Sequence, residues 1–209
     1  MKKLSLILAV LLFIAALPAS APGSAGDDTI KKMLPAFGSL IYAMYDMNAA
    51  YDPRDPDFFW TAIFNMAANW ESLNPIAEVT EWTSFTLPVQ TVQEMASALF
   101  ADYEGLPDVP ESVSELVSYD EPLGVYRFPL FYVGCMYTKI DASMNASDGC
   151  VFVTVILMSF GEPAFGQKDE LMGRYEFIIQ PNTYAAEIGE PKYLYSVVSA
   201  GRSADQPNA

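Results

Sequence analysis

The 209-residue sequence contains no histidine and none of the glycine-rich phosphate-binding signatures. Ser-His-Asp and Cys-His catalytic groups, H-E-x-x-H metal sites, zinc fingers and histidine general bases all require histidine, so these classes are excluded. The missing G-x-x-x-x-G-K-[ST] and G-x-G-x-x-G motifs leave nucleotide cofactors without support. No cofactor and no metal are therefore expected, and no enzyme class is indicated.

Basic residues are also scarce. Lys and Arg number 11 against 26 Asp and Glu, which gives a formal net charge of −15. Such a field repels nucleic acid and anionic lipid, so nucleic acid is not expected as a partner. The acids are scattered along the chain, a distribution typical of an acidic, soluble exported protein.

The first 25 residues resemble a secretory signal peptide. Lys2 and Lys3 precede an apolar stretch, Leu4–Leu17, which is shorter than the roughly 20 residues that a spanning helix needs. Small residues follow, and Pro22 disfavours the first of two cleavage sites, so cleavage is expected after Ala25. We therefore expect a secreted or periplasmic protein without a membrane span after signal removal. An uncleaved N-terminal anchor is the alternative.

The remaining length fits one domain, expected over residues 26–200, with a polar tail at 201–209. Apolar residues recur at helical spacing from Leu34 to Met47. Asp55 and Pro56 then form a cap-and-proline start for a second helix through Trp70. This helix is apolar on two sides, and its thirteen residues from Phe58 to Trp70 span only about 20 Å, so it is predicted to lie in the core.

A strand and a third helix are expected next. Residues Trp82–Val89 alternate in polarity, which predicts a strand. Thr91 and Glu94 have the spacing of a capping box, which predicts a helix beginning there and extending to Tyr103. A short helix is expected over Ser112–Val117.

The second half of the chain predicts an antiparallel meander, in which the Val151 strand is apolar on both sides and is expected to be covered on both. The expected strands are Val125–Val133, Val151–Phe160, Tyr175–Gln180 and Tyr193–Ser199. The predicted fold is α+β, with about three N-terminal helices packed on a C-terminal antiparallel meander. This element order resembles the cone-shaped nuclear-transport-factor-like and cystatin-like folds, in which a curved sheet and its helices enclose a pocket, an enzyme site or a packed core.

Cys135 and Cys150 flank the expected loop between the first two meander strands. A turn near Ala142 or Ser143 would bring the two cysteines opposite each other, and export permits oxidation, so a disulfide is one prediction and two buried thiols are the other.

Candidate binding residues lie on the Val125 strand, where Tyr126, Phe128, Leu130 and Tyr132 alternate toward one side. They would line a pocket for an apolar or sugar-like ligand, or they would form plain core. Two oxygen-rich stretches, 46–57 and 141–148, fit calcium loops poorly, because Tyr51 and Ala146 stand where glycine is needed.

Three functions remain open. The first is a secreted non-catalytic binding or interaction module for an unknown small molecule or protein partner. The second is an exported hydrolase using paired carboxylates, for which Glu71, Glu78, Glu81 and Glu94 are available. The third is a structural subunit of an envelope complex, which an exposed apolar patch would favour.

Overall fold

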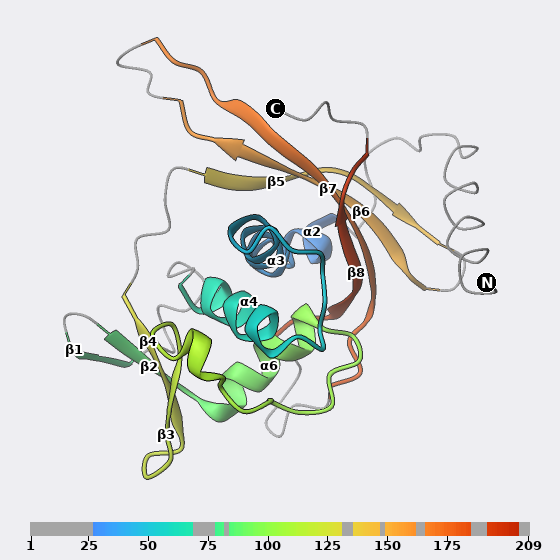
Figure 1. Ribbon diagram of the computed structural model, residues 1–209. Helices are drawn as coiled ribbons and strands as arrows, with labels where there is room; N and C mark the ends of the chain where they lie inside the picture. The colour runs from blue at the N-terminus through green and yellow to red at the C-terminus, as the bar shows by residue number, and fades with distance from the viewer. Residues whose placement is uncertain are drawn as a thin grey trace, which may run out of the picture.

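A computed structural model describes residues 27–68, 78–81, 84–130, 136–146, 149–161, 166–184 and 192–204. The fold is α+β, with N-terminal helices, a four-stranded antiparallel meander of order β5-β6-β7-β8 and a second, smaller sheet of order β1-β2-β4-β3 (Figure 1). The helices are α2 (Asp27–Lys31), α3 (Leu34–Asp46), α4 (Pro56–Ala68), α6 (Val89–Leu99) and the 3-10 helix η1 (Glu111–Val113). The strands are β1 (Glu78–Glu81), β2 (Ser84–Pro88), β3 (Ser118–Asp120), β4 (Val125–Pro129), β5 (Met136–Asn145), β6 (Val151–Ser159), β7 (Glu170–Pro181) and β8 (Tyr195–Arg202).

The helices lie between the two sheets (Figure 1). Helix α3 packs against the meander, where the rings of Phe37 and Phe177 are 4.7 Å apart. The Tyr42 hydroxyl on the same helix donates to the backbone oxygen of Met136 at 2.9 Å. Helix α4 lies on the other side of α3 and reaches the smaller sheet, and α6 contacts both sheets. The meander bends around α3 (Figure 1), and its concave face forms one side of the hydrophobic core.

Helix α4 begins as the sequence predicts. Asp55 caps it by accepting a hydrogen bond from the Asp57 amide at 2.9 Å, and Pro56 occupies the first helical position, where its missing N–H costs nothing. Phe58, Trp60 and Ile63 have 0% of their surface exposed, which confirms the core prediction for this helix. Trp70 lies outside the described residues. In the described part of the chain, none of the helices has the length and apolar character that crossing a membrane would require.

Helix α6 corrects the capping-box prediction. It begins at Val89 rather than Thr91, and no side chain caps it. Pro88 ends β2 with an extended backbone, φ −57° and ψ 147°, and the chain turns directly into the helix. Thr91 therefore lies inside the first turn, where the capping geometry is unavailable. The helix ends at Leu99, four residues before the expected Tyr103, because Phe100 is already extended.

The meander contains a different first strand from the predicted one. The Val125 strand, β4, pairs with β2 and β3 in the smaller sheet, so its assignment to the meander is wrong. The meander starts instead with β5, where the sequence pattern predicts no strand. Strand β5 is an edge strand with polar residues on both sides, among them Thr138 and Lys139, and such strands lack the apolar alternation that predicts a strand. Strand β8 continues to Arg202, into the residues expected to form the tail.

Strand β6 is central in the sheet, as predicted, but only one of its faces is fully buried. Val153, Val155 and Leu157 face the helices with at most 2% exposed. Phe152 and Ile156, on the opposite face, are only partly buried. The expectation that both faces of this strand are covered is therefore wrong for the outer one.

The turn expected near Ala142 is also corrected, because Ala142 lies within β5 and pairs with Thr154. The chain turns after β5 instead, where the Ala146 amide donates to the Cys150 oxygen at 2.8 Å. Met136 pairs with Ser159 at the opposite end of this hairpin. Cys135 lies outside the described residues, and no disulfide is present in the described part of the chain.

Candidate functional site

A hollow of about 670 Å³ opens between α6, the segment 106–109, the turn after η1, and strands β3 and β4. Both apolar and polar side chains line it. The apolar lining residues are Val89, Leu106, Pro107, Val109 and Val117. The polar ones are Gln93, Asp108, Ser114, Ser118, Tyr119 and Tyr126. A hollow of this size and composition can hold a small organic molecule.

Trp60 connects the core to the hollow. Its indole packs on the ring of Tyr126 with 5.0 Å between centroids, and its Nε1 donates to the backbone oxygen of Asp108 at 3.2 Å. The Asp108 segment lies between Pro107 and Pro110, whose fixed φ angles restrict the chain. The wall of the hollow is thus attached to the buried helix α4.

A hairpin supplies the aromatic side of the hollow. Tyr119 on β3 and Tyr126 on β4 are register partners, and their ring centroids are 4.9 Å apart. Tyr126 is 7% exposed, whereas Tyr119 is 48% exposed at the rim. The connecting turn depends on Gly124, which has a φ of 64° that other residues adopt only with strain. A ligand can therefore contact one deep and one outer tyrosine ring.

The electrostatics of the hollow favour neutral or positively charged ligands. Burial, then Tyr119 and Asp108, raise the pKa of Tyr126, so its hydroxyl stays protonated and can donate a hydrogen bond at neutral pH. Asp108 is the only carboxylate, and Lys and Arg are absent, among the described residues that line the hollow. An anionic group placed there would face a carboxylate without a compensating cation.

Further tyrosines stand behind the α6 side of the hollow. The Tyr184 hydroxyl donates to the Gln93 side-chain oxygen at 3.3 Å, which orients that amide. Tyr103 packs edge-on against Tyr184, 6.2 Å between centroids, and its buried hydroxyl has no hydrogen-bond partner in the described part of the chain. Burial, with smaller contributions from Tyr184 and Tyr126, raises the pKa of Tyr103 to about 12. A buried hydroxyl of this kind normally bonds to water or another polar group.

The four predicted lining residues are distributed over different environments. Tyr126 lines the hollow, whereas Phe128 is fully buried and stacks on Phe85 at 5.5 Å. Leu130 follows the end of β4 and is 41% exposed, and Tyr132 lies outside the described residues.

Gln93, Asp108 and Tyr119 were missed as site residues. For Tyr119 a signal existed, because the stretch from Asp120 to Gly124 has the composition of a tight turn: the Gly124 amide donates to the Asp120 oxygen at 2.9 Å.

The hydrolase hypothesis required two carboxylates facing each other across a cleft. Glu71 lies outside the described residues, as do the side chains of Glu78 and Glu81, and Glu94 is not among the residues that line the hollow. Across the residues described here, no group of three or more Cys, Asp or Glu side chains has the arrangement of a metal site.

No protein-family model matches the chain, and no curated protein or solved structure is similar to it.

Proposed function

We propose that this chain is a secreted or periplasmic, non-catalytic binding module, and that its ligand occupies the hollow beside Tyr119 and Tyr126. The observation that carries the proposal is the pair of tyrosine rings, 4.9 Å apart, next to the Asp108 carboxylate in a hollow of about 670 Å³. Aromatic faces bind flat apolar surfaces such as sugar rings, and they attract cations. The ligand is thus a neutral or cationic organic molecule with a flat face, bound by tyrosine, serine and amide groups.

The architecture supports a binding role more than hydrolysis. Paired carboxylates would have to flank a substrate, and the hollow offers Asp108 alone among its described lining residues. The bent meander over the helices supports the proposed likeness to cone-shaped folds, in which a sheet and its helices enclose a cavity. The hollow, however, lies beside the smaller sheet rather than inside the curved one, so the likeness does not choose the site.

The experiment is ligand-observed NMR on the chain beginning at Gly26, with three sets of probes: neutral saccharides, aromatic amines and aromatic carboxylates. We expect binding from the first or the second set and none from the carboxylates. Tyr119→Ala removes the outer ring and should weaken binding by about tenfold. Tyr45→Ala is the matched control, because Tyr45 is also 48% exposed but lies at the end of α3, away from the hollow.

Asp108→Asn distinguishes the two ligand types, since it should weaken the binding of an amine and leave the binding of a saccharide nearly unchanged. Preferential binding of carboxylates, or equal binding by the Tyr119→Ala and wild-type chains, would contradict the proposal.

A further inference from the structure

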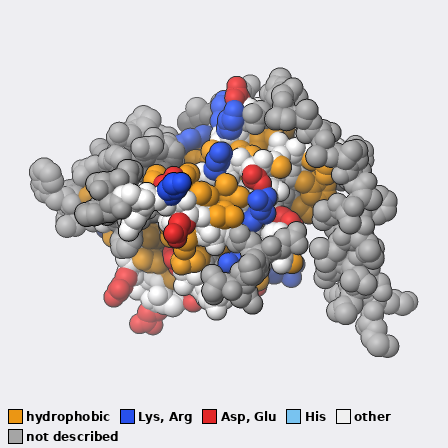
Figure 2. Space-filling model, turned by 90° about the horizontal axis from the view of Figure 1, so that it is seen from above, with side chains coloured by type: hydrophobic (Ala, Val, Ile, Leu, Met, Phe, Trp, Pro, Cys, Tyr) orange, Lys and Arg blue, Asp and Glu red, His pale blue; other side chains and the backbone are white. Residues whose placement is uncertain are grey.

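The outer face of the meander carries several apolar side chains although it is turned away from the helices. Along β6 the inner residues Val153, Val155 and Leu157 are buried against the helices, and Phe152, Ile156 and Met158 point to the opposite side and are partly exposed. The view from above, which looks onto the side where this sheet lies, shows hydrophobic side chains gathered between Lys, Arg, Asp and Glu side chains (Figure 2). Apolar side chains gathered on a face that is turned away from the core are a feature of interaction surfaces.

Strand pairing arranges this outer face in four rows that each cross β5, β6 and β7. The first row and the last row are apolar, and the two middle rows carry the charges. In order along β6, the rows are Tyr137, Met158 and Leu171; Lys139, Ile156 and Arg174; Ala142, Thr154 and Glu176; and Met144, Phe152 and Ile178.

The four rows are self-complementary when a second copy of the sheet is related to the first by a two-fold rotation. The axis of this rotation lies in the plane of the interface, runs perpendicular to the strands and passes between the two middle rows. The rotation places the first row of one copy on the last row of the other. The same rotation sets Arg174 of one chain opposite Glu176 of its partner, twice. Apolar rows thus meet apolar rows, and opposite charges meet.

We propose that the outer face of β5, β6 and β7 is the interface of a homodimer, formed by the two-fold packing of the meanders of two copies. The contact would be isologous, the commonest arrangement in soluble oligomers. The strands of two packed sheets cross at about −30°. Because neighbouring strands are about 4.8 Å apart, this crossing angle displaces a residue on the neighbouring strand by only about 2 to 3 Å. The Arg174 and Glu176 side chains are long enough to absorb that displacement.

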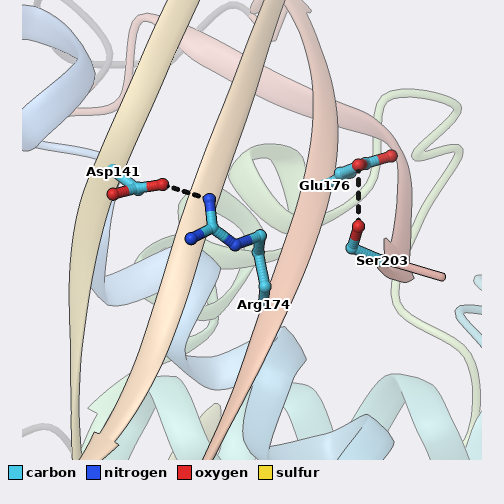
Figure 3. A network of polar contacts seen from close by, with 4 residues as sticks. All are labelled: Asp141, Arg174, Glu176 and Ser203. Atoms are coloured by element: carbon cyan, nitrogen blue, oxygen red, sulfur yellow. Dashed lines mark hydrogen bonds and ion pairs between the residues drawn. The ribbon is translucent and has the colours of Figure 1, made fainter. Parts of the chain in front are cut away.

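The charged groups on this face can form further hydrogen bonds and ion pairs with a second copy of the chain. Arg174 reaches across β6 to an ion pair with Asp141 on β5, and Glu176 accepts a hydrogen bond from the Ser203 hydroxyl at 3.1 Å (Figure 3). A guanidinium has five N–H donors and a carboxylate two oxygens, so each can also bind across the interface. Lys139 and Arg174 balance Asp141 and Glu176, so this face has no net charge although the chain as a whole carries a formal charge of −15.

The test is sedimentation velocity over a range of concentrations on the chain beginning at Gly26. We expect the wild-type protein to sediment as a dimer that dissociates on dilution. Ile156→Asp buries a charge at the centre of the interface and should raise the dimer dissociation constant at least about a hundredfold, with circular dichroism unchanged.

Charge reversal tests the two-fold arrangement itself. Arg174→Glu and Glu176→Arg should each weaken the homodimer by about tenfold, because like charges then face each other twice. An equimolar mixture of the two variants should recover tight association, since both contacts become attractive in the heterodimer. Arg54→Glu is the control, as it makes the same charge change at an exposed position of the loop before α4.

A chain that stays monomeric at every concentration, or a dimer that survives Ile156→Asp, would overturn the interface. A mixture that associates no more tightly than either variant alone would overturn the two-fold geometry. The hollow lies beside β3 and β4, so these variants should leave ligand binding unchanged, and either proposal can fail without the other.

Discussion

The indole nitrogen of Trp60 donates a hydrogen bond to the backbone oxygen of Asp108 at 3.2 Å, across 48 residues of sequence. This bond links the centre of the core to the wall of the hollow, because Trp60 is fully buried and Asp108 lines the hollow. The Ser112 hydroxyl adds a second link between this region and α4, with a bond of 2.6 Å to the Asp57 carboxylate. The shape of the hollow therefore depends on residues that a ligand does not touch.

The first prediction concerns that link. Trp60→Phe removes the donor and part of the ring, and should lower the free energy of unfolding by about 2 to 4 kcal/mol through the lost hydrogen bond and the cavity. Binding at the hollow should weaken in the same variant, since the Asp108 segment loses its attachment. Urea unfolding and probe titration measure the two effects, and a variant with normal stability would contradict the link.

A second prediction tests the core role of α4. Ile63 has none of its surface exposed, and Ile63→Ala should cost about 2 to 5 kcal/mol of unfolding free energy. Leu123→Ala is the matched control, because Leu123 is 68% exposed and its truncation should change stability by less than about 0.5 kcal/mol. Equal melting temperatures for the two variants would point to an exposed helix.

A third prediction follows from the buried tyrosines. Burial raises the pKa of Tyr103 and of Tyr193 to about 12, and raises that of Tyr51 further still. The folded state thus holds these protons more tightly than the unfolded state, whose tyrosines titrate near pH 10. The contribution of Tyr103 and Tyr193 to stability is complete below pH 10 and is lost as the pH rises from 10 to about 12, and that of Tyr51 continues to be lost at higher pH.

Ultraviolet titration of phenolate absorbance measures this effect. The buried tyrosines should ionise above pH 10, together with the loss of circular dichroism. Tyr103→Phe should make the fall in stability over this range less steep. A single transition at pH 10 with the structure intact would show that the tyrosines are accessible.

The fourth prediction concerns export. If residues 1–25 act as a signal, the protein secreted from a suitable host should begin at Gly26, and its intact mass should lack the preceding segment. A secreted or membrane-held product that retains Met1 would instead favour the uncleaved anchor.

Local sequence signals predicted those helices and strands whose formation depends mainly on residues nearby in the chain. Helix α4 was found from the Asp55-Pro56 start and its helical spacing, because capping and amphipathicity act within a few turns. Strand β6 was found from its continuous apolar residues. The Thr91–Glu94 signal failed, since the extended backbone of Pro88 starts α6 two residues earlier and the capping geometry is lost.

The sequence by itself determined the α+β class, the core helices and the strands β6 to β8, because hydrophobic periodicity reports directly which side of an element is buried. Only the tertiary structure decided which strands pair. Pairing depends on residues far apart in the chain, such as Phe85 with Phe128 across β2 and β4, and local composition does not encode it. The hollow depends on that pairing, since Gln93, Asp108 and Tyr119 come from three separate segments and meet only because β3 and β4 pack beside α6.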